Sequence, residues 1–211
     1  MFRYMWRHRC RPPLLSVAFL KCWAKRVLTL PSLLQMVFFR MRLVLRGASI
    51  GGDSCIGKAV VEGKVHMLSV GVSTFIGRVK IAVHDRVEIG ANVCINDGVQ
   101  ILTASHDVRD PAWGRISKPV VIEDYAWIAT DSLILPGVRI GRGAVIGAGA
   151  VVGKDVPANA VAVGNPLVIR EGQRSSNLAY NPVRFLAFQD AWLGKAVSGR
   201  MAADPSDAPS T

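Results

Sequence analysis

The sequence predicts an all-β fold, a parallel β-helix of six-residue repeats, with a helical extension before it and a short helix after it. The main observation is that between residues 122 and 156 an aliphatic residue returns every six positions, and a small or short residue follows four positions after each. A period of six fits neither an α-helix nor simple strand alternation. It is typical of short strands and corners that stack as coils around a shared core. The aliphatic positions are Ile122, Ile128, Ile134, Ile140, Ile146 and Val152, and the second set is Ala126, Ser132, Val138, Ala144, Ala150 and Val156.

Composition and pattern divide the chain of 211 residues into four parts around one core. We expect a basic amphipathic helical extension over residues 1–46, the repeat domain over 47–171, a C-terminal helix over 172–197 and a disordered tail over 198–211. The net charge of +11 is uneven, because residues 1–49 hold ten Lys or Arg and no Asp or Glu. The rest of the chain, with sixteen basic and fifteen acidic residues, is nearly neutral.

The extension mixes Arg and Lys with Trp, Phe and Leu, which favours one or two helices with an apolar and a basic face. Such helices lie on anionic membrane surfaces or cap the open end of a solenoid. Both roles stay open and are compatible. The longest uncharged apolar run, Val27 to Phe39, has thirteen residues and contains Pro31. We therefore expect it to be too short to span a bilayer, and the Arg and Trp before it do not resemble an export signal.

Four cysteines, Cys10, Cys22, Cys55 and Cys94, are scattered without CxxC spacing, which fits a reducing, cytoplasmic setting. We expect a cytoplasmic protein, peripheral at the inner membrane surface if the extension binds lipid. Nucleic acid is not an expected partner, because no recognition motif accompanies the basic block.

The repeat begins at Ile50, wavers between residues 61 and 80, and recovers from Val83. It breaks between His106 and Lys118, where no aliphatic ladder is present. Ile101 and Ile122 are 21 positions apart, which is not a multiple of six, so the break must leave the coil as a loop. After residue 156 prolines and Gly164 end the repeat, and a roughly helical spacing of apolar residues follows between 178 and 193.

His106 lies where the ladder breaks into this loop. An imidazole suits proton removal near neutral pH, so His106 is a candidate general base. The alternative is a turn histidine that hydrogen-bonds to the backbone. The sequence alone leaves both open.

Several ordered motifs resemble those of the hexapeptide-repeat O-acetyltransferases, especially the branch that acetylates exopolysaccharide and lipopolysaccharide sugars, with maltose and galactoside acetyltransferases as cousins. The motifs are VCINDGVQILTASHD (residues 93–107), KPVVIEDYAWI (118–128), LPGV (135–138) and residues 161–166. The resemblance covers about residues 47–171 and implies a left-handed β-helix. It also implies acetyl-CoA as co-substrate, no metal, a sugar hydroxyl as acceptor, direct attack without a covalent intermediate, and a homotrimer with active sites between neighbouring prisms.

The resemblance also assigns roles to residues. His106 matches the general base, and a backbone N–H in the run Trp127-Ile128-Ala129-Thr130 matches the donor to the charge on the thioester oxygen. Trp127 would line the pantetheine and acceptor site, and the ladder that contains it would form a wall facing the segment with His106. The remaining matches are Ala148 beside the pantetheine and Lys154 and Arg170 near the CoA phosphates. Asp107 is a candidate to orient His106 or bind the acceptor, and Asn96 and Trp113 are candidates to line the sugar pocket. For these three residues a local turn, capping or packing role is the alternative.

Three departures from the family pattern stand out. Ala129 replaces the usual Gly after Trp-Ile. The closing motif Asn165-Pro166-Leu167-Val168-Ile169-Arg170 is one residue short, and Gly77 follows Phe75-Ile76 where related sugar transferases often carry Asn. The last change argues against a simple maltose-like or galactoside-like acceptor.

Two other functions fit the same fold. One is a non-catalytic scaffold or ligand-binding β-helix. The other is a γ-type carbonic anhydrase, which needs three zinc-binding histidines. The repeat domain offers His66, His84 and His106 without a close pair, so we expect no metal site.

Overall fold

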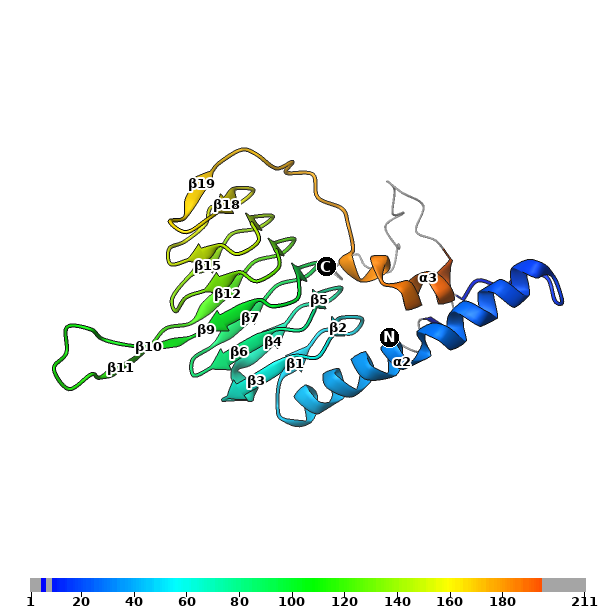
Figure 1. Ribbon diagram of the computed structural model, residues 1–211, viewed down its shortest axis with the longest axis horizontal. Helices are drawn as coiled ribbons and strands as arrows, with labels where there is room; N and C mark the ends of the chain where they lie inside the picture. Colours follow the sequence, from blue (N-terminus) through cyan, green and yellow to red (C-terminus); the bar gives the residue numbers. More distant parts are fainter. Residues whose placement is uncertain (1–4, 7–8, 195–211) are drawn as a thin grey trace, which may run out of the picture.

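The computed structural model describes residues 5–6 and 9–194, and residues 47–170 within it form a parallel β-helix of about six turns (Figure 1). Each turn contributes one strand to each of three sheets, as the repeat predicts, and these strands pair in parallel except for β19 (Val168–Arg170), which pairs antiparallel with β18 (Val161–Val163). The first sheet contains β1 (Ser49–Ile50), β4 (Leu68–Val70), β7 (Val87–Ile89), β12 (Val120–Ile122) and β15 (Arg139–Ile140). The second contains β2 (Cys55–Ile56), β5 (Phe75–Ile76), β8 (Cys94–Ile95), β13 (Trp127–Ile128), β16 (Val145–Ile146), β18 (Val161–Val163) and β19 (Val168–Arg170). The third contains β3 (Val60–Gly63), β6 (Lys80–Val83), β9 (Gln100–Leu102), β14 (Leu133–Ile134) and β17 (Val151–Val152).

The two predicted ladders form the core of the prism. All twelve ladder positions between Ile122 and Val156 are at most 2% exposed. Ile128 pairs with Ile146, 18 positions on, so three repeats of six complete one coil. The aliphatic ladder therefore stacks in register along the axis, and each coil buries the apolar face of its neighbour.

The wavering of the repeat between residues 61 and 80 has a structural cause. Early coils are longer than eighteen residues, because Ile56 pairs with Ile76, twenty positions on. A 3-10 helix, η1 (Val65–Met67), fills the corner between β3 and β4 and uses the extra residues. The strands of neighbouring coils therefore still pair in register, although the spacing of aliphatic residues in the sequence is no longer six.

The predicted interruption is an antiparallel hairpin of β10 (Ala104–His106) and β11 (Arg115–Ser117), which projects from the prism (Figure 1). It leaves the coil after β9 of the third sheet and returns to β12 of the first sheet. The loop prediction is therefore confirmed.

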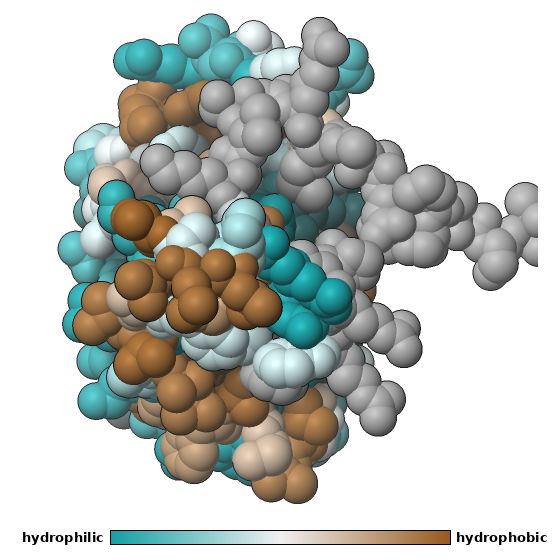
Figure 2. Space-filling model, turned by 90° about the vertical axis from the view of Figure 1, so that its right-hand side faces the viewer, coloured by the Kyte–Doolittle hydropathy of each residue, from teal (hydrophilic) through white to brown (hydrophobic). Residues whose placement is uncertain are grey.

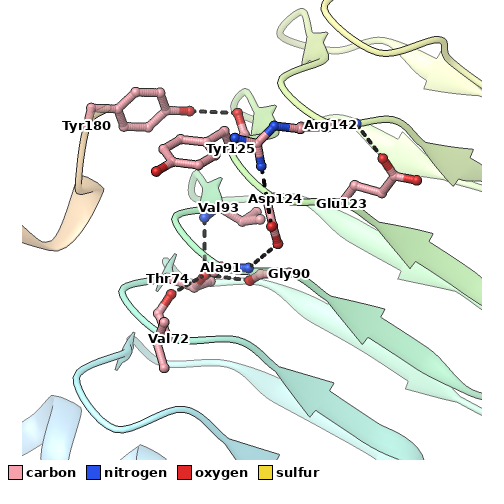
Figure 3. Close-up of polar contacts among 10 residues, drawn as sticks. All are labelled: Val72, Thr74, Gly90, Ala91, Val93, Glu123, Asp124, Tyr125, Arg142 and Tyr180. Carbon is pink, nitrogen blue, oxygen red and sulfur yellow. Dashed lines mark hydrogen bonds and ion pairs between the residues drawn. The ribbon is translucent and has the colours of Figure 1, made fainter. Parts of the chain in front are cut away.

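Polar side chains fasten the corner between the first and second sheets (Figure 3). Asp124 Oδ1 accepts a hydrogen bond of 2.8 Å from Ala91 N, and the hydroxyl of Thr74 donates to Gly90 O at 2.7 Å. Each bond joins one coil to the next, so these side chains are structural. Together they make the scaffold rigid on the side away from the hairpin.

Residues 17–45 of the N-terminal extension form one continuous helix, α2 (Val17–Leu45), capped by Ser16, whose hydroxyl accepts from Phe19 N at 3.0 Å. Pro31 lies inside the helix without ending it. We attribute the continuity to packing on both sides of Pro31, because Arg26, Leu33 and Leu43 are buried along one stripe.

The expectation that this segment is too short to span a bilayer was wrong. Twenty-nine residues form one helix, which is long and apolar enough to cross a membrane by length and composition. The uncharged run from Val27 to Phe39 is only part of the helix, which also includes Lys25, Arg26 and Arg40.

The C-terminal end of α2 caps the first coil. Capping the open end of the solenoid was one of the two roles expected for this segment. Leu43 belongs to the core of the prism, and Phe39 packs against that core. Arg40 Nη2 donates to the carbonyls of Ile50 and Gly51 at 3.1 and 3.0 Å, and Arg46 Nη1 donates to Val61 O at 3.0 Å. Three carbonyls at the open end of the solenoid are thus satisfied.

The C-terminal segment turns back from β19 toward α2 (Figure 1). Its helices, η2 (Pro182–Phe185) and α3 (Ala187–Leu193), are shorter than the helix expected over 172–197, because residues 171–181 form an extended connection. Val183, Phe188 and Trp192 pack with Leu33 of α2 and with Cys55. Residues 195–197 of the expected helix and the tail over 198–211 lie outside the described residues.

Arg26 locks α3 onto α2. Its guanidinium, 4% exposed, donates to the carbonyls of Ala191 at 3.1 Å and Cys10 at 2.6 Å and lies 5.0 Å from the Trp192 ring centroid. Hydrogen bonds to a charged group are among the stronger ones in proteins. The two helices at the base of the prism therefore form one unit.

Candidate active site

Trp127 and Ile128 of β13 point in opposite directions. Ile128 is fully buried in the core, whereas Trp127 is 43% exposed on the outer surface of the second sheet. In register, Cys94 lies on one side of Trp127 and Val145 on the other. Strand alternation thus presents one large aromatic surface beside smaller side chains.

Asn96 lies next to this aromatic, one position beyond β8. Asn96 N donates to Ile128 O at 2.9 Å, and the amide oxygen of Asn96 accepts from Cys94 Sγ at 3.3 Å. Burial raises the pKa of the Cys94 thiol to about 11, with the nearby Arg174 guanidinium acting in the opposite direction. A thiol that stays protonated at neutral pH keeps donating to Asn96 and holds its side chain in place.

The backbone after Trp127 offers one free donor. Ala129 N donates to Ile146 O at 2.9 Å within the stacked coils, so it is not available to a substrate. Among the residues that the structure describes, no acceptor for Thr130 N was found, while Thr130 O accepts from Gly149 N at 2.9 Å. Of the Ala129 and Thr130 N–H groups, only that of Thr130 has no acceptor among the described residues, at a corner that it shares with exposed Ala148.

The position of Gly77 has a steric explanation. A Cβ at residue 77 would lie 2.3 Å from Asp97 Oδ1. Asp97 is itself held by Arg78, which donates its backbone N–H and its side-chain Nε at 2.8 Å each. These bonds lower the pKa of Asp97, with the backbone N–H as the largest cause. A side chain at 77 would displace this carboxylate.

The hairpin holds His106 in one tautomer. His106 Nδ1 lies 2.7 Å from Trp113 O, and the two rings stack with centroids 4.1 Å apart and 21° between their planes. A carbonyl oxygen only accepts, so Nδ1 carries the proton in the neutral ring and Nε2 keeps its lone pair. His106 is therefore prepared to accept a proton through Nε2.

The expected role of Asp107 in orienting His106 is filled by the Trp113 carbonyl. The carboxylate of Asp107 instead accepts from Arg109 N at 2.9 Å, which closes a turn in the hairpin loop. Asp110, which the sequence did not single out, accepts from Ala112 N and Gly114 N at 2.9 Å each. It thereby fixes the loop around Trp113, whose φ of 52° lies in the left-handed region.

The expected site residues fall into two groups on different sides of one prism. His106, Asp107 and Trp113 lie on the hairpin between the third and first sheets, and Lys154 follows β17 at the same corner. The second group lies on the second sheet or at its corner with the third sheet, and contains Asn96, Trp127, Ala129, Thr130, Ala148 and Arg170. Within a single chain, the wall with Trp127 therefore does not face His106, contrary to the expectation from the sequence.

Comparison with known proteins agrees with this architecture. The family model for bacterial transferase hexapeptide (six repeats) matches residues 119–154. The chain is also 36% identical over 140 residues to "Putative colanic acid biosynthesis acetyltransferase WcaF" of Escherichia coli K12, covering 64% of this chain and 77% of that protein. This chain belongs to the hexapeptide-repeat acetyltransferase family.

Two solved structures resemble the acetyltransferase. A hexapeptide-repeat acetyltransferase of Vibrio cholerae in complex with acetyl coenzyme A is 29% identical, with a TM-score of 0.59, over 78% of this chain and 94% of that one. A maltose O-acetyltransferase of Clostridium difficile is 29% identical, with a TM-score of 0.60, over 79% and 87%. Family membership makes this protein an enzyme rather than the non-catalytic scaffold considered above.

A search for metal ligands finds no group of three His, Cys, Asp or Glu side chains placed to hold an ion within residues 5–6 and 9–194. His66 lies in η1, His84 follows β6 and His106 lies in the hairpin.

Arg174 and Tyr180 lie beside the site and could not be found from the sequence. Arg174 Nη1 donates to Tyr125 O at 3.0 Å and to Gly143 O at 2.9 Å. The Tyr180 hydroxyl donates to Tyr125 O at 2.7 Å (Figure 3). These bonds hold the connection over residues 171–181 against the corner that leads into β13. Neither residue belongs to a repeat or motif, so only the fold could show this contact.

Proposed function

We propose that this acetyltransferase transfers the acetyl group of acetyl-CoA to a hydroxyl of a sugar in a bacterial polysaccharide or its precursor, with His106 as general base. The main support is the bond from His106 Nδ1 to Trp113 O, which leaves Nε2 to accept a proton. The names of the relatives support the substrate class, since they include a colanic acid biosynthesis acetyltransferase and a maltose O-acetyltransferase.

The proposed reaction is one direct displacement. His106 Nε2 takes the proton of the sugar hydroxyl while that oxygen attacks the thioester carbonyl, and a new C–O bond forms. The Thr130 N–H donates to the carbonyl oxygen as negative charge develops on it. The C–S bond then breaks, and the imidazolium returns its proton to the CoA sulfur. The products are an acetyl ester and CoA, and no covalent enzyme intermediate is needed.

The residues on the second sheet are suited to hold the CoA thioester. Trp127 offers an exposed aromatic surface, Ala148 leaves the adjoining corner open, and Arg170 lies on the edge strand β19. Lys154, on the hairpin side of the prism, would add positive charge from a second chain. Arginine and lysine side chains are suited to the phosphates of a nucleotide.

We further propose that each active site forms between two copies of the chain in a homotrimer. The support is that the hairpin and Trp127 lie on opposite sides of one prism. Contact between the hairpin of one copy and the second sheet of the next uses two different surfaces, and such head-to-tail contacts close into a ring of three when neighbouring copies are related by a rotation of about 120°. Three copies would give three equivalent sites.

The test is an assay of CoA release with a panel of acceptors: free sugars, nucleotide sugars, lipid-linked oligosaccharides and isolated polysaccharide. We expect CoA release that depends on the acceptor and a product heavier by one acetyl group. Mild alkali should remove that group, since it cleaves esters and leaves amides intact. Transfer that resists alkali would identify an amine acceptor and contradict the proposal, as would the absence of transfer to every acceptor.

A further inference from the structure

The outward side of α2 is mostly apolar, with the exposed Arg42 in its last turn. The helix uses one stripe for packing, which includes Arg26, Leu33 and Leu43. Large apolar side chains cover much of the remaining circumference and are 55–79% exposed; among them are Leu20, Val27, Leu28, Leu34, Phe38 and Leu45. Figure 2 shows neighbouring apolar side chains on the lower half of the molecule, where α2 lies. The helix is thus apolar on two sides, of which the fold covers one.

The charges on α2 itself have one sign. Residues 1–49 contain no Asp or Glu. Lys21 and Lys25 are exposed and lie one turn apart along a flank of the outward surface. An apolar helix side bordered by lysines suits an anionic lipid surface, where the apolar residues enter the boundary between headgroups and acyl chains.

The packed side of α2 argues against a bilayer span. Arg26 and Arg40 lie within the helix and bond to carbonyls of Ala191, Cys10, Ile50 and Gly51. Insertion across a bilayer would break these bonds and place the cations in the hydrocarbon, which is costly. It would also expose Phe188 and Trp192, which α2 now helps to bury. A helix lying in the plane of the surface keeps every one of these contacts.

We propose that α2 lies in the plane of an anionic lipid membrane, with its outward apolar side inserted and Lys21 and Lys25 at the level of the lipid phosphates. A second copy of the chain is a poorer occupant, because two α2 helices would bring like charges together and α2 carries no acid to pair with them. The base of the prism would then face the lipid. This proposal does not depend on the acetyl-transfer reaction.

The test is flotation of the purified full chain with preformed vesicles of phosphatidylcholine alone, or of phosphatidylcholine with one quarter phosphatidylglycerol. We compare wild type with Val27→Glu/Leu34→Glu, which places acids at two side chains that are 64% and 58% exposed. The control Val108→Glu/Val168→Glu makes the same change at 91% and 52% exposed sites on the hairpin and on β19. Circular dichroism and a thermal melt verify that each variant folds.

We expect wild type and the control to bind the anionic vesicles equally. The Val27→Glu/Leu34→Glu variant should lose about 100-fold in partition coefficient for the vesicles, since each change removes an apolar side chain that the proposal places in the lipid. Lys21→Gln/Lys25→Gln should lose about tenfold or more, and 1 M salt should weaken wild-type binding by shortening the screening length. Equal binding of wild type and Val27→Glu/Leu34→Glu, or no wild-type binding to anionic vesicles, would overturn the proposal. A smaller oligomer in Val27→Glu/Leu34→Glu without any vesicle binding would assign the surface to a second copy instead.

Discussion

Replacing His106 with alanine should lower kcat by about 10²–10⁴-fold, the usual contribution of a general base. The change removes Nε2, which the bond from Nδ1 to Trp113 O leaves free to accept a proton. The variant should stay folded, because His106 is exposed on a projecting hairpin. KM for acetyl-CoA should change little, since we place the thioester mainly against the second sheet of the neighbouring copy.

The measurement is acceptor-dependent CoA release at saturating substrates. Asp107→Asn is the matched control, since its side chain can still accept from Arg109 N and does not hold His106. We expect Asp107→Asn to retain most of the activity. Equal turnover by wild type and His106→Ala would remove His106 from the mechanism.

Ile128→Ala should lower stability, whereas Trp127→Ala should weaken acetyl-CoA binding, although the two residues are neighbours on β13. Ile128 is fully buried and stacks between Ile95 and Ile146 of adjacent coils, so its truncation should reduce the free energy of unfolding by about 2–5 kcal/mol. Trp127 is on the outer surface, and its truncation should change stability by less than about 1 kcal/mol while raising KM for acetyl-CoA.

Denaturant unfolding at one fixed protein concentration measures the first effect, because assembly makes apparent stability depend on concentration. Steady-state kinetics measures the second. A large loss of stability in Trp127→Ala would mean that this side chain belongs to the fold rather than to a binding surface.

The β-helix could be predicted because its core repeats one local pattern, an aliphatic residue at every sixth position. Every third ladder position returns to the same sheet, so Ile128 and Ile146 had to stack once the period was six. The hairpin could be predicted for the same reason, since 21 residues do not fit the repeat. The failures came where the period gives no information, as in the length of α2, which depends on packing against α3 and the first coil.

The residues of the candidate site could be predicted from the sequence, but their relative positions in the fold could not. His106 and Trp127 were both identified, yet the sequence does not state which corner of the prism a hairpin leaves. That follows from strand order, which places β9 and β12 in different sheets and β13 in the remaining one. Likewise, the tautomer of His106 depends on a carbonyl seven residues away, and the occupied N–H of Ala129 depends on the next coil.

The central claim is that one active site needs the hairpin of one chain and the second sheet of another. The most direct test is to co-express His106→Ala and Trp127→Ala chains with different tags, purify mixed oligomers through both tags, and assay CoA release at low acetyl-CoA. Each parent should be nearly inactive under these conditions. In a mixed trimer, one contact joins an intact hairpin to an intact Trp127, so the account predicts recovery of about one third of wild-type activity. Mixed oligomers as inactive as their parents would contradict it and would place the whole site within a single chain.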